Sequence, residues 1–321
     1  MNAAVEIIGF FAGVLAVFGA ALGVGKAVGP VETAAPAEHA MDAGHDEDSA
    51  SHADTGENGA EATQYPKGLM VSQAGYTFDL ATATAAAGAD RQVTFTIIGP
   101  EGEPVTEFDV EHEKRLHLIA VRRDFTGFQH VHPEMDENGT WIGALSLTPG
   151  QWRLFADFKA TGVEAVTLGN ELAVSGDYRP APAPGETRTA TVDGYTVTLD
   201  GDLTAGHDAE LTLSVSKDGL PVTDLEPYLG AYGHLVALRA GDLAYLHVHP
   251  DGTPDDGTTE PGPDVVFYAE VPSPGRYQLY LDFKRGGVVR TAAFTVTAAG
   301  TGAAPSAPEP TESGEGHSDA H

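Results

Sequence analysis

The stretches "PGQWRLFADFK" (residues 149–159) and "PGRYQLYLDFK" (residues 274–284) contain the pattern that decides the fold. In the second stretch, every other residue from Tyr277 to Phe283 is aliphatic or aromatic, and the residues between them include Gln278 and Asp282. Side chains of a β-strand alternate between the two faces of a sheet, so this period of two predicts a strand with one face in a core. Because the stretch occurs twice, it also indicates an internal duplication.

Other segments return in the same order along the chain. "GYTFDL" (75–80) returns as "GYTVTL" (194–199), and "HLIAVR" (117–122) returns as "HLVALR" (234–239). Within each copy, short runs rich in Val, Leu, Thr, Phe and Tyr are separated by Gly, Pro or Asp about every 8–12 residues, which is typical of a β-sandwich.

We therefore predict an all-β protein with two tandem immunoglobulin-like β-sandwich domains, at residues 67–176 and 187–298. The segment between them, residues 177–186, reads "DYRPAPAPGE", and its alternating prolines favour an extended, semi-rigid spacer. Residues 29–66 and 299–321 are rich in Ala, Gly and acidic residues, contain histidines and have little to bury, so both segments are predicted to be disordered.

The N-terminal residues 4–28 include 19 consecutive uncharged residues, 7–25, which is close to the length of a membrane-spanning helix. We predict a transmembrane helix or signal anchor there. A cleaved secretory signal is the alternative, because small residues follow, but the start "MNAAVE" lacks the basic region of such signals. The single basic residue nearby, Lys26, favours a cytoplasmic body by the positive-inside rule.

The composition excludes several classes of function. Lys and Arg number 17 against 47 Asp and Glu, a formal net charge of −30, so the surface repels nucleic acid and attracts cations. The chain has no cysteine, which excludes thiolate sites and cysteine nucleophiles, and its 4 methionines argue against a thioether site for Cu(I).

Histidines occupy equivalent positions in both copies. If Gly241 and Asp242 form a two-residue turn, the paired residues of the two strands have numbers that sum to 483. His234 then lies directly opposite His249, and His247 is its diagonal neighbour on the same face. The same arithmetic, with a sum of 249, places His117 opposite His132 and diagonal to His130 in the first copy. A bulge at Gly127 is the alternative there, and a one-residue slip would turn His117 to the other face.

Three imidazoles that converge in this way predict one metal site in each copy. A histidine set without thiolate favours Cu(II) in the divalent series, with Zn(II) as the second choice. Asp157 and Asp282, each in "DFK", are candidates for a fourth ligand or an outer hydrogen-bond acceptor. The alternative is that these aspartates are exposed partners of Lys159 and Lys284.

The stretches "HLIAVRRDFTGFQHVHPE" (117–134) and "PGQWRLFADF" (149–158), with their second copies, resemble uncharacterised membrane-anchored or exported proteins of high-GC bacteria with duplicated HxxxxR…HxHP sandwich domains. More loosely, the chain is similar to the exported β-sandwich copper proteins of the CopC and YtkA types. That resemblance implies copper handling outside the cytoplasm, although the methionine-rich Cu(I) motif and N-terminal histidine ligand of those proteins are absent here.

The leading hypothesis is a non-enzymatic, single-pass protein of the cell membrane with extracytoplasmic domains. It would bind a divalent metal, with copper(II) favoured and zinc possible, and buffer it or deliver it to a metal transporter or envelope protein. The alternative is an envelope adhesion or interaction protein whose sandwiches are structural. A metal-activated hydrolase is a third possibility, but no nucleophile elbow, phosphate loop or paired-carboxylate motif supports an enzyme.

Overall fold

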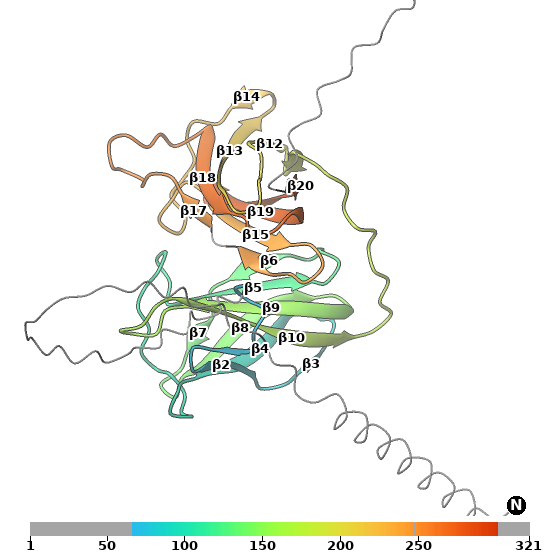
Figure 1. Ribbon diagram of the computed structural model, residues 1–321, viewed down its shortest axis with the longest axis vertical. Coiled ribbons are helices and arrows are strands. Elements are labelled where there is room, and N and C mark those ends of the chain that lie inside the picture. The colour runs from blue at the N-terminus through green and yellow to red at the C-terminus, as the bar shows by residue number, and fades with distance from the viewer. Residues whose placement is uncertain (1–65, 247, 301–321) are drawn as a thin grey trace, which may run out of the picture. The chain divides into compact units, whose positions relative to one another are not determined.

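Strands with the predicted alternation pair into two sheets in each copy (Figure 1). The computed structural model describes residues 66–246 and 248–300, and all of these lie within one compact unit of the chain. The strands of the first repeat are β1 (Ser72–Gln73), β2 (Tyr76–Leu80), β3 (Thr84–Ala86), β4 (Gly88–Ile98), β5 (Leu116–Arg122), β6 (Gln129–Val131), β7 (Glu134–Met135), β8 (Thr140–Leu147), β9 (Gly150–Phe158) and β10 (Val166–Ser175).

The second repeat follows the same plan. Its strands are β11 (Thr189–Val192), β12 (Tyr195–Asp200), β13 (Asp208–Lys217), β14 (Leu220–Pro221), β15 (His234–Arg239), β16 (Tyr245–Leu246), β17 (Val248–Pro250), β18 (Asp264–Glu270), β19 (Gly275–Arg285) and β20 (Val288–Ala298). The described residues contain no helix, so the predictions of an all-β chain and of two tandem sandwich domains are confirmed.

In each repeat one sheet carries the first histidine of the predicted trio, His117 in β5 and His234 in β15. The sheets of the first repeat have the orders β1-β2-β4-β8-β7 and β3-β10-β9-β5-β6. Those of the second have the orders β11-β12-β13-β18-β17, with β14 added to β13, and β16-β15-β19-β20. The parallel pairing of β3 with β10 is the exception in an otherwise antiparallel set of ladders. We call β3-β10-β9-β5-β6 and β16-β15-β19-β20 the histidine sheets.

Each repeat has its own apolar core between its two sheets. In the first, Phe95 and Trp141 of one sheet pack in the same cluster as Trp152 and Leu154 of the other. In the second, Leu213 and Phe267 meet Tyr277, Leu279, Leu281, Phe283 and Phe294 in the same way. The alternation predicted for residues 276–283 is therefore confirmed.

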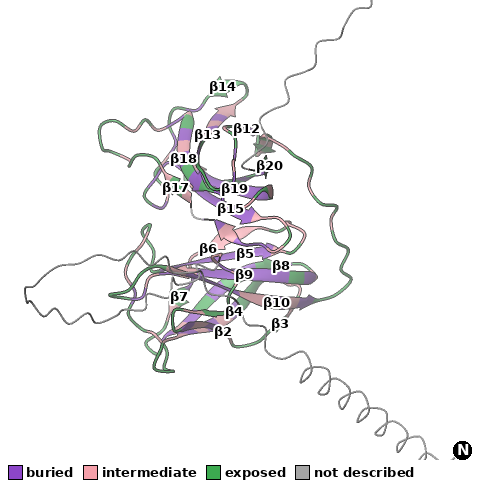
Figure 2. Cartoon of the chain, in the orientation of Figure 1, coloured by how far each residue is buried: buried purple, intermediate pink, exposed green. Residues whose placement is uncertain are grey.

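The opposite faces of the histidine sheets are also buried. Ile119, Val121 and Phe155 of the first repeat form one cluster with Val236, Leu238, Leu243 and Tyr280 of the second. We call this cluster the junction. Alternate residues of β5, β9, β15 and β19 thus face either their own core or the other repeat, and these strands are coloured as buried over most of their length (Figure 2).

The hairpin registers agree with the arithmetic of the sequence. In the first repeat Ile119 pairs with His130, a sum of 249, and in the second Ala237 pairs with Leu246, a sum of 483. Phe125 has a φ of 66° and Gly127 a φ of 69°, which allow the first turn to close without moving His117 to the other face. The predicted registers are confirmed where the ladders exist.

The predicted anchor at residues 4–28, most of the linker 29–66 and most of the tail 299–321 lie outside the described residues. Within the part of the chain that the structure describes, no helix has the length and apolar character needed to cross a membrane. The spacer between the repeats contacts both of them. The Ala181 N–H donates to Asp124 Oδ2 at 2.8 Å, and Arg276 donates to the Pro184 carbonyl at 3.2 Å.

Candidate metal centre

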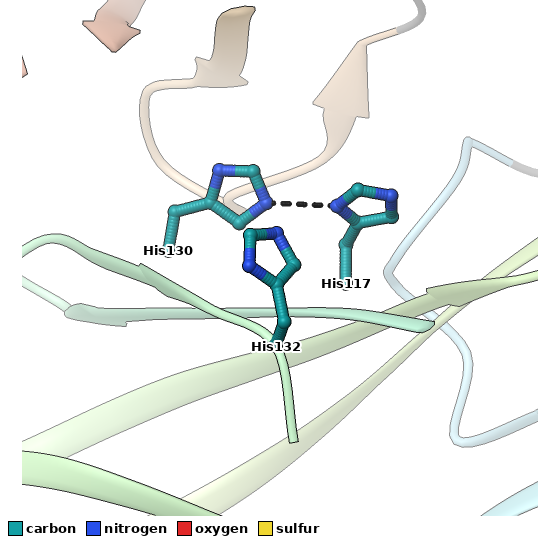
Figure 3. A group of neighbouring side chains, drawn as sticks. All are labelled: His117, His130 and His132. Atoms are coloured by element: carbon teal, nitrogen blue, oxygen red, sulfur yellow. Dashed lines mark hydrogen bonds between the residues drawn. The ribbon is translucent and has the colours of Figure 1, made fainter. Parts of the chain in front are cut away.

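His117, His130 and His132 gather on one side of the β5–β6 hairpin (Figure 3). His117 is the second residue of β5, His130 lies in β6, and His132 follows the end of β6. Nδ1 of His117 is 3.0 Å from Nε2 of His130, and one ligand atom from each of the three residues lies within 4.8 Å of the others. The three rings therefore converge as the register predicted.

A second group lies across the junction and shares His130. It consists of His130, His234 and Asp282, whose ligand atoms also lie within 4.8 Å of one another. Nδ1 of His130 is 3.0 Å from Oδ2 of Asp282, and the rings of His130 and His234 have centroids 4.7 Å apart. The two aspartates lie opposite the first histidine of each predicted trio. Asp157 of β9 pairs with His117, and Asp282 of β19 pairs with His234. We call the four histidines with Asp282 the histidine cluster.

Most of the cluster is buried. The side chains of His130 and Asp282 are 1% and 3% exposed, and His117 is 4% exposed. Nε2 of His132 and Nδ1 of His234 are buried without a hydrogen-bond partner. Buried polar atoms in proteins almost always have a partner, so these two nitrogens are exceptions of the kind that a bound ion would satisfy.

The surroundings of His117, His132 and His234 lower the pKa of these three imidazoles. Burial, together with the neighbouring His130, lowers the pKa of His117 to about 3 and that of His132 to about 4. Burial also lowers the pKa of His234 well below its usual value, again with His130 contributing. A neutral imidazole is the form that binds a metal ion, so the rings do not have to lose a proton at neutral pH.

Outer contacts orient the ligands. Nε2 of His117 lies 3.1 Å from the Glu111 carbonyl, which assigns the ring proton to Nε2 and leaves the Nδ1 lone pair facing the cluster. Thr291 Oγ1 donates to Oδ1 of Asp282 at 2.5 Å, which leaves Oδ2 facing His130. Such outer hydrogen bonds are typical of residues that bind metals through their other atom.

The structure does not form the predicted pairing of His234 with His249. Strand β16 ends at Leu246, and β17 joins the opposite sheet, where His249 pairs with Tyr268 and is exposed. His247 lies outside the described residues. The prediction of a separate trio in the second repeat is therefore wrong for His249, and His234 instead lies against the histidines of the first repeat.

The two aspartates are not exposed partners of lysines, so that alternative is wrong. Asp282 is 2% exposed, and Lys284 pairs with Glu226 instead, at 3.6 Å. Asp157 is partly buried and accepts a hydrogen bond from Thr167 at 2.8 Å, and its burial raises its pKa. Among the described residues, Asp157 belongs to neither of the two groups, whereas Asp282 belongs to the second.

His112 has no counterpart in the other repeat, and we interpret it from the sequence as a surface residue and not as a ligand. It is exposed, and its ring lies 6.1 Å from that of His117 and 6.0 Å from that of His234. Its φ of 46° places it in a tight loop, a conformation that no pattern in the sequence indicates. An open pocket of about 580 Å³, lined by His132 with Glu113, Glu134 and Met135 among others, connects this side of the cluster to solvent.

A family model described as "Domain of unknown function (DUF8832)" matches residues 71–173 and again residues 190–300. The duplication and the uncharacterised nature of the repeated domain, both predicted from the sequence, agree with this match. No curated protein matches the chain in sequence. The comparisons contain no support for the looser resemblance to CopC and YtkA.

Solved structures with similar folds include two adhesins. The Escherichia coli adhesin FdeC has a TM-score of 0.23 and 16% identity, over 71% of this chain and 65% of that chain. The Yersinia pseudotuberculosis adhesin InvE has a TM-score of 0.21 and 12% identity, over 70% and 59%. Domains 4–9 of the surface layer protein SbsC have a TM-score of 0.23 and 13% identity, over 71% and 31%.

The match thus covers less than two thirds of each of these three structures. None of the comparisons shows a metal-binding function. At these TM-scores the likeness carries no information on what this chain binds.

Proposed function

The chain belongs to the family of the Domain of unknown function (DUF8832), and we propose that it binds a divalent metal ion, copper(II) in preference to zinc(II), at the histidine cluster. The observation that carries the proposal is the convergence of His117, His130 and His132, with ligand atoms within 4.8 Å of one another. Two nitrogens that each lie about 2 Å from one ion are at most about 4 Å apart, so small shifts of the rings would bring ligand atoms at this spacing onto one ion. Imidazole ligands without a thiolate favour copper(II) in the divalent series.

The proposed role is binding without catalysis, in which the protein buffers the metal or passes it to a transporter or envelope protein. In this proposal, residues 4–28 tether the protein to the cell membrane with its sandwich domains on the extracytoplasmic side. The uncharged run 7–25 and the resemblance to exported proteins support that placement. The net charge of −30 supports a cation as the partner.

Titration calorimetry with Cu(II) and Zn(II) tests the proposal on the full-length chain in detergent. The variant with His117, His130 and His132 changed to alanine is expected to lose its tight Cu(II) binding while its circular dichroism spectrum stays that of a β protein. His207→Ala is the matched control, because His207 is an exposed histidine outside the cluster and its loss should leave binding unchanged. Equal Cu(II) affinity in the triple variant and the wild type would contradict a metal site in the cluster.

An envelope adhesion or interaction module, in which the sandwich domains are structural, is the competing function. In that case the histidines only fill the junction. The same titration separates the two functions, since an adhesion module predicts no tight metal binding in the wild type either.

A further inference from the structure

The two ring nitrogens of His130 face different partners. Nε2 is 3.0 Å from Nδ1 of His117, and Nδ1 is 3.0 Å from Oδ2 of Asp282. These nitrogens lie at different edges of one planar ring, and a metal ion binds a single ring nitrogen along its lone pair. One ion therefore cannot use His130 together with both groups of ligands.

Each group also has its own buried nitrogen without a partner. In the group of His117, His130 and His132 it is Nε2 of His132, and in the group of His130, His234 and Asp282 it is Nδ1 of His234. One ion in the first group would satisfy His132 and leave His234 unsatisfied. Two positive charges, one on each side of the His130 ring, would satisfy both nitrogens.

The proton positions leave room for an ion at each nitrogen of His130. Because His117 donates from Nε2 to the Glu111 carbonyl, its Nδ1 presents a lone pair to His130. On the other edge, His130 faces the carboxylate of Asp282. Both edges of the ring thus face acceptors, and either a proton or a metal ion on each nitrogen satisfies this arrangement.

We propose that the histidine cluster holds two divalent metal ions side by side, bridged by the imidazole of His130. One ion is bound by His117, His132 and Nε2 of His130, and the other by His234, Asp282 and Nδ1 of His130. The bridge forms when the neutral ring releases its one N–H proton to solvent, with no change of oxidation state. The resulting negative ring and the Asp282 carboxylate partly offset the charge of the two ions. This inference rests on the metal-binding function proposed above.

Copper(II) titration followed by electron paramagnetic resonance tests the bridge. Copper(II) is added stepwise to the full-length chain, and a competing chelator then removes ions held by isolated histidines. The signal is expected to rise up to one equivalent and to fall as the second ion enters, because two copper(II) ions joined through one imidazolate couple antiferromagnetically.

Two variants and a control assign the effect. Asp282→Asn is expected to lose the second ion and give the uncoupled signal of one copper, and His130→Ala is expected to abolish the coupling, so that its signal no longer falls when a second equivalent is added. His249→Ala should keep it, since His249 lies in the opposite sheet. Circular dichroism checks that each variant is folded, and the wild-type titration decides the question without them.

The outcomes separate the two proposals. One tight, uncoupled equivalent in the wild type would overturn the bridge and leave the proposed function standing. Two tight equivalents without coupling would also overturn the bridge. No tight binding at all would overturn both.

Discussion

The H-V-H-P hairpin follows different paths in the two repeats. In the first, β6 stays paired with β5 through Val131, so His130 and His132 lie beside His117. In the second, the ladder of β15 with β16 ends at Leu246, and β17 pairs with β18 of the opposite sheet. The same sequence motif thus builds a histidine trio once, and the point at which the chain changes sheets decides which histidines converge.

The contacts that each hairpin makes with the other repeat differ as well. Phe128, before β6, stacks on Tyr280 with ring centroids 3.9 Å apart and planes 9° apart. Tyr245, at the equivalent position of the second hairpin, meets Phe155 at 5.7 Å and 53°. The first hairpin is therefore held more closely against its neighbour, which fixes the histidines that it carries.

The largest effect is expected from Tyr280→Ala. This change removes a fully buried ring and the hydrogen bond from Tyr280 to the Phe125 carbonyl at 2.8 Å, so unfolding should become easier by about 3–5 kcal/mol. Tyr280→Phe keeps the stack and should cost about 1 kcal/mol. Urea denaturation measures both changes, and equal losses would show that the stack contributes nothing.

The next largest effect is expected from the equivalent histidines of the two hairpins, His132 and His249. His132→Ala removes one of three converging ligands and should weaken Cu(II) binding by about 100-fold, which corresponds to about 2.7 kcal/mol. His249→Ala changes the equivalent residue of the second repeat and should leave the affinity within about twofold, because β17 carries it to the other sheet. Chelator competition measures both affinities, and similar losses would mean that the two repeats bind metal alike.

Acid should destabilise the metal-free protein through the first repeat. The pKa of His117 is lowered to about 3, below the value of about 6.5 in an unfolded chain, so the unfolded state binds more protons between these values. Stability from this residue is complete above about pH 6.5 and falls with pH, by on the order of 2 kcal/mol at pH 5.

Thermal unfolding at pH 7 and pH 5 measures this loss, expected as a fall of roughly 4–8 °C. His117→Gln should reduce the difference between the two pH values. The comparison of variants is needed because the raised pKa of Asp157 acts in the opposite direction. An unchanged pH dependence in His117→Gln would remove His117 as its cause.

The smallest expected difference concerns the two turns. A Cβ at Gly127 would lie 2.6 Å from Cη2 of Trp152, whereas a Cβ at Gly241 meets nothing within 4 Å. Both glycines have positive φ, so both alanine variants should be destabilised, with Gly127→Ala worse by about 1 kcal/mol. Equal midpoints in chemical denaturation would show that the ring of Trp152 moves aside freely.

The sequence predicted the local part of the fold. Alternation from Tyr277 to Phe283 gave the strand and its inner face, and the turn residues set the hairpin registers. These features depend on neighbours along the chain, so a pattern of period two and a turn suffice to predict them.

The shared cluster depends on contacts between distant segments, and the sequence pattern contains only an indirect signal for it. "HLIAVR" and "HLVALR" are apolar at nearly every position, which is typical of strands buried on both faces rather than one. That signal indicates that each histidine sheet is covered on its outer face. It does not identify the other repeat as the cover, nor the residue at which β16 gives way to β17.

The proposed metal site would link metal binding to the contact between the two repeats. His130 belongs to the first repeat and Asp282 to the second, so an ion bound by both would hold the two repeats together. By mass action, an ion that binds only when the two repeats are in contact stabilises that contact. Tension that separates the repeats would therefore release the ion. If the protein were attached at two points and stretched between them, it would thus release its metal ion.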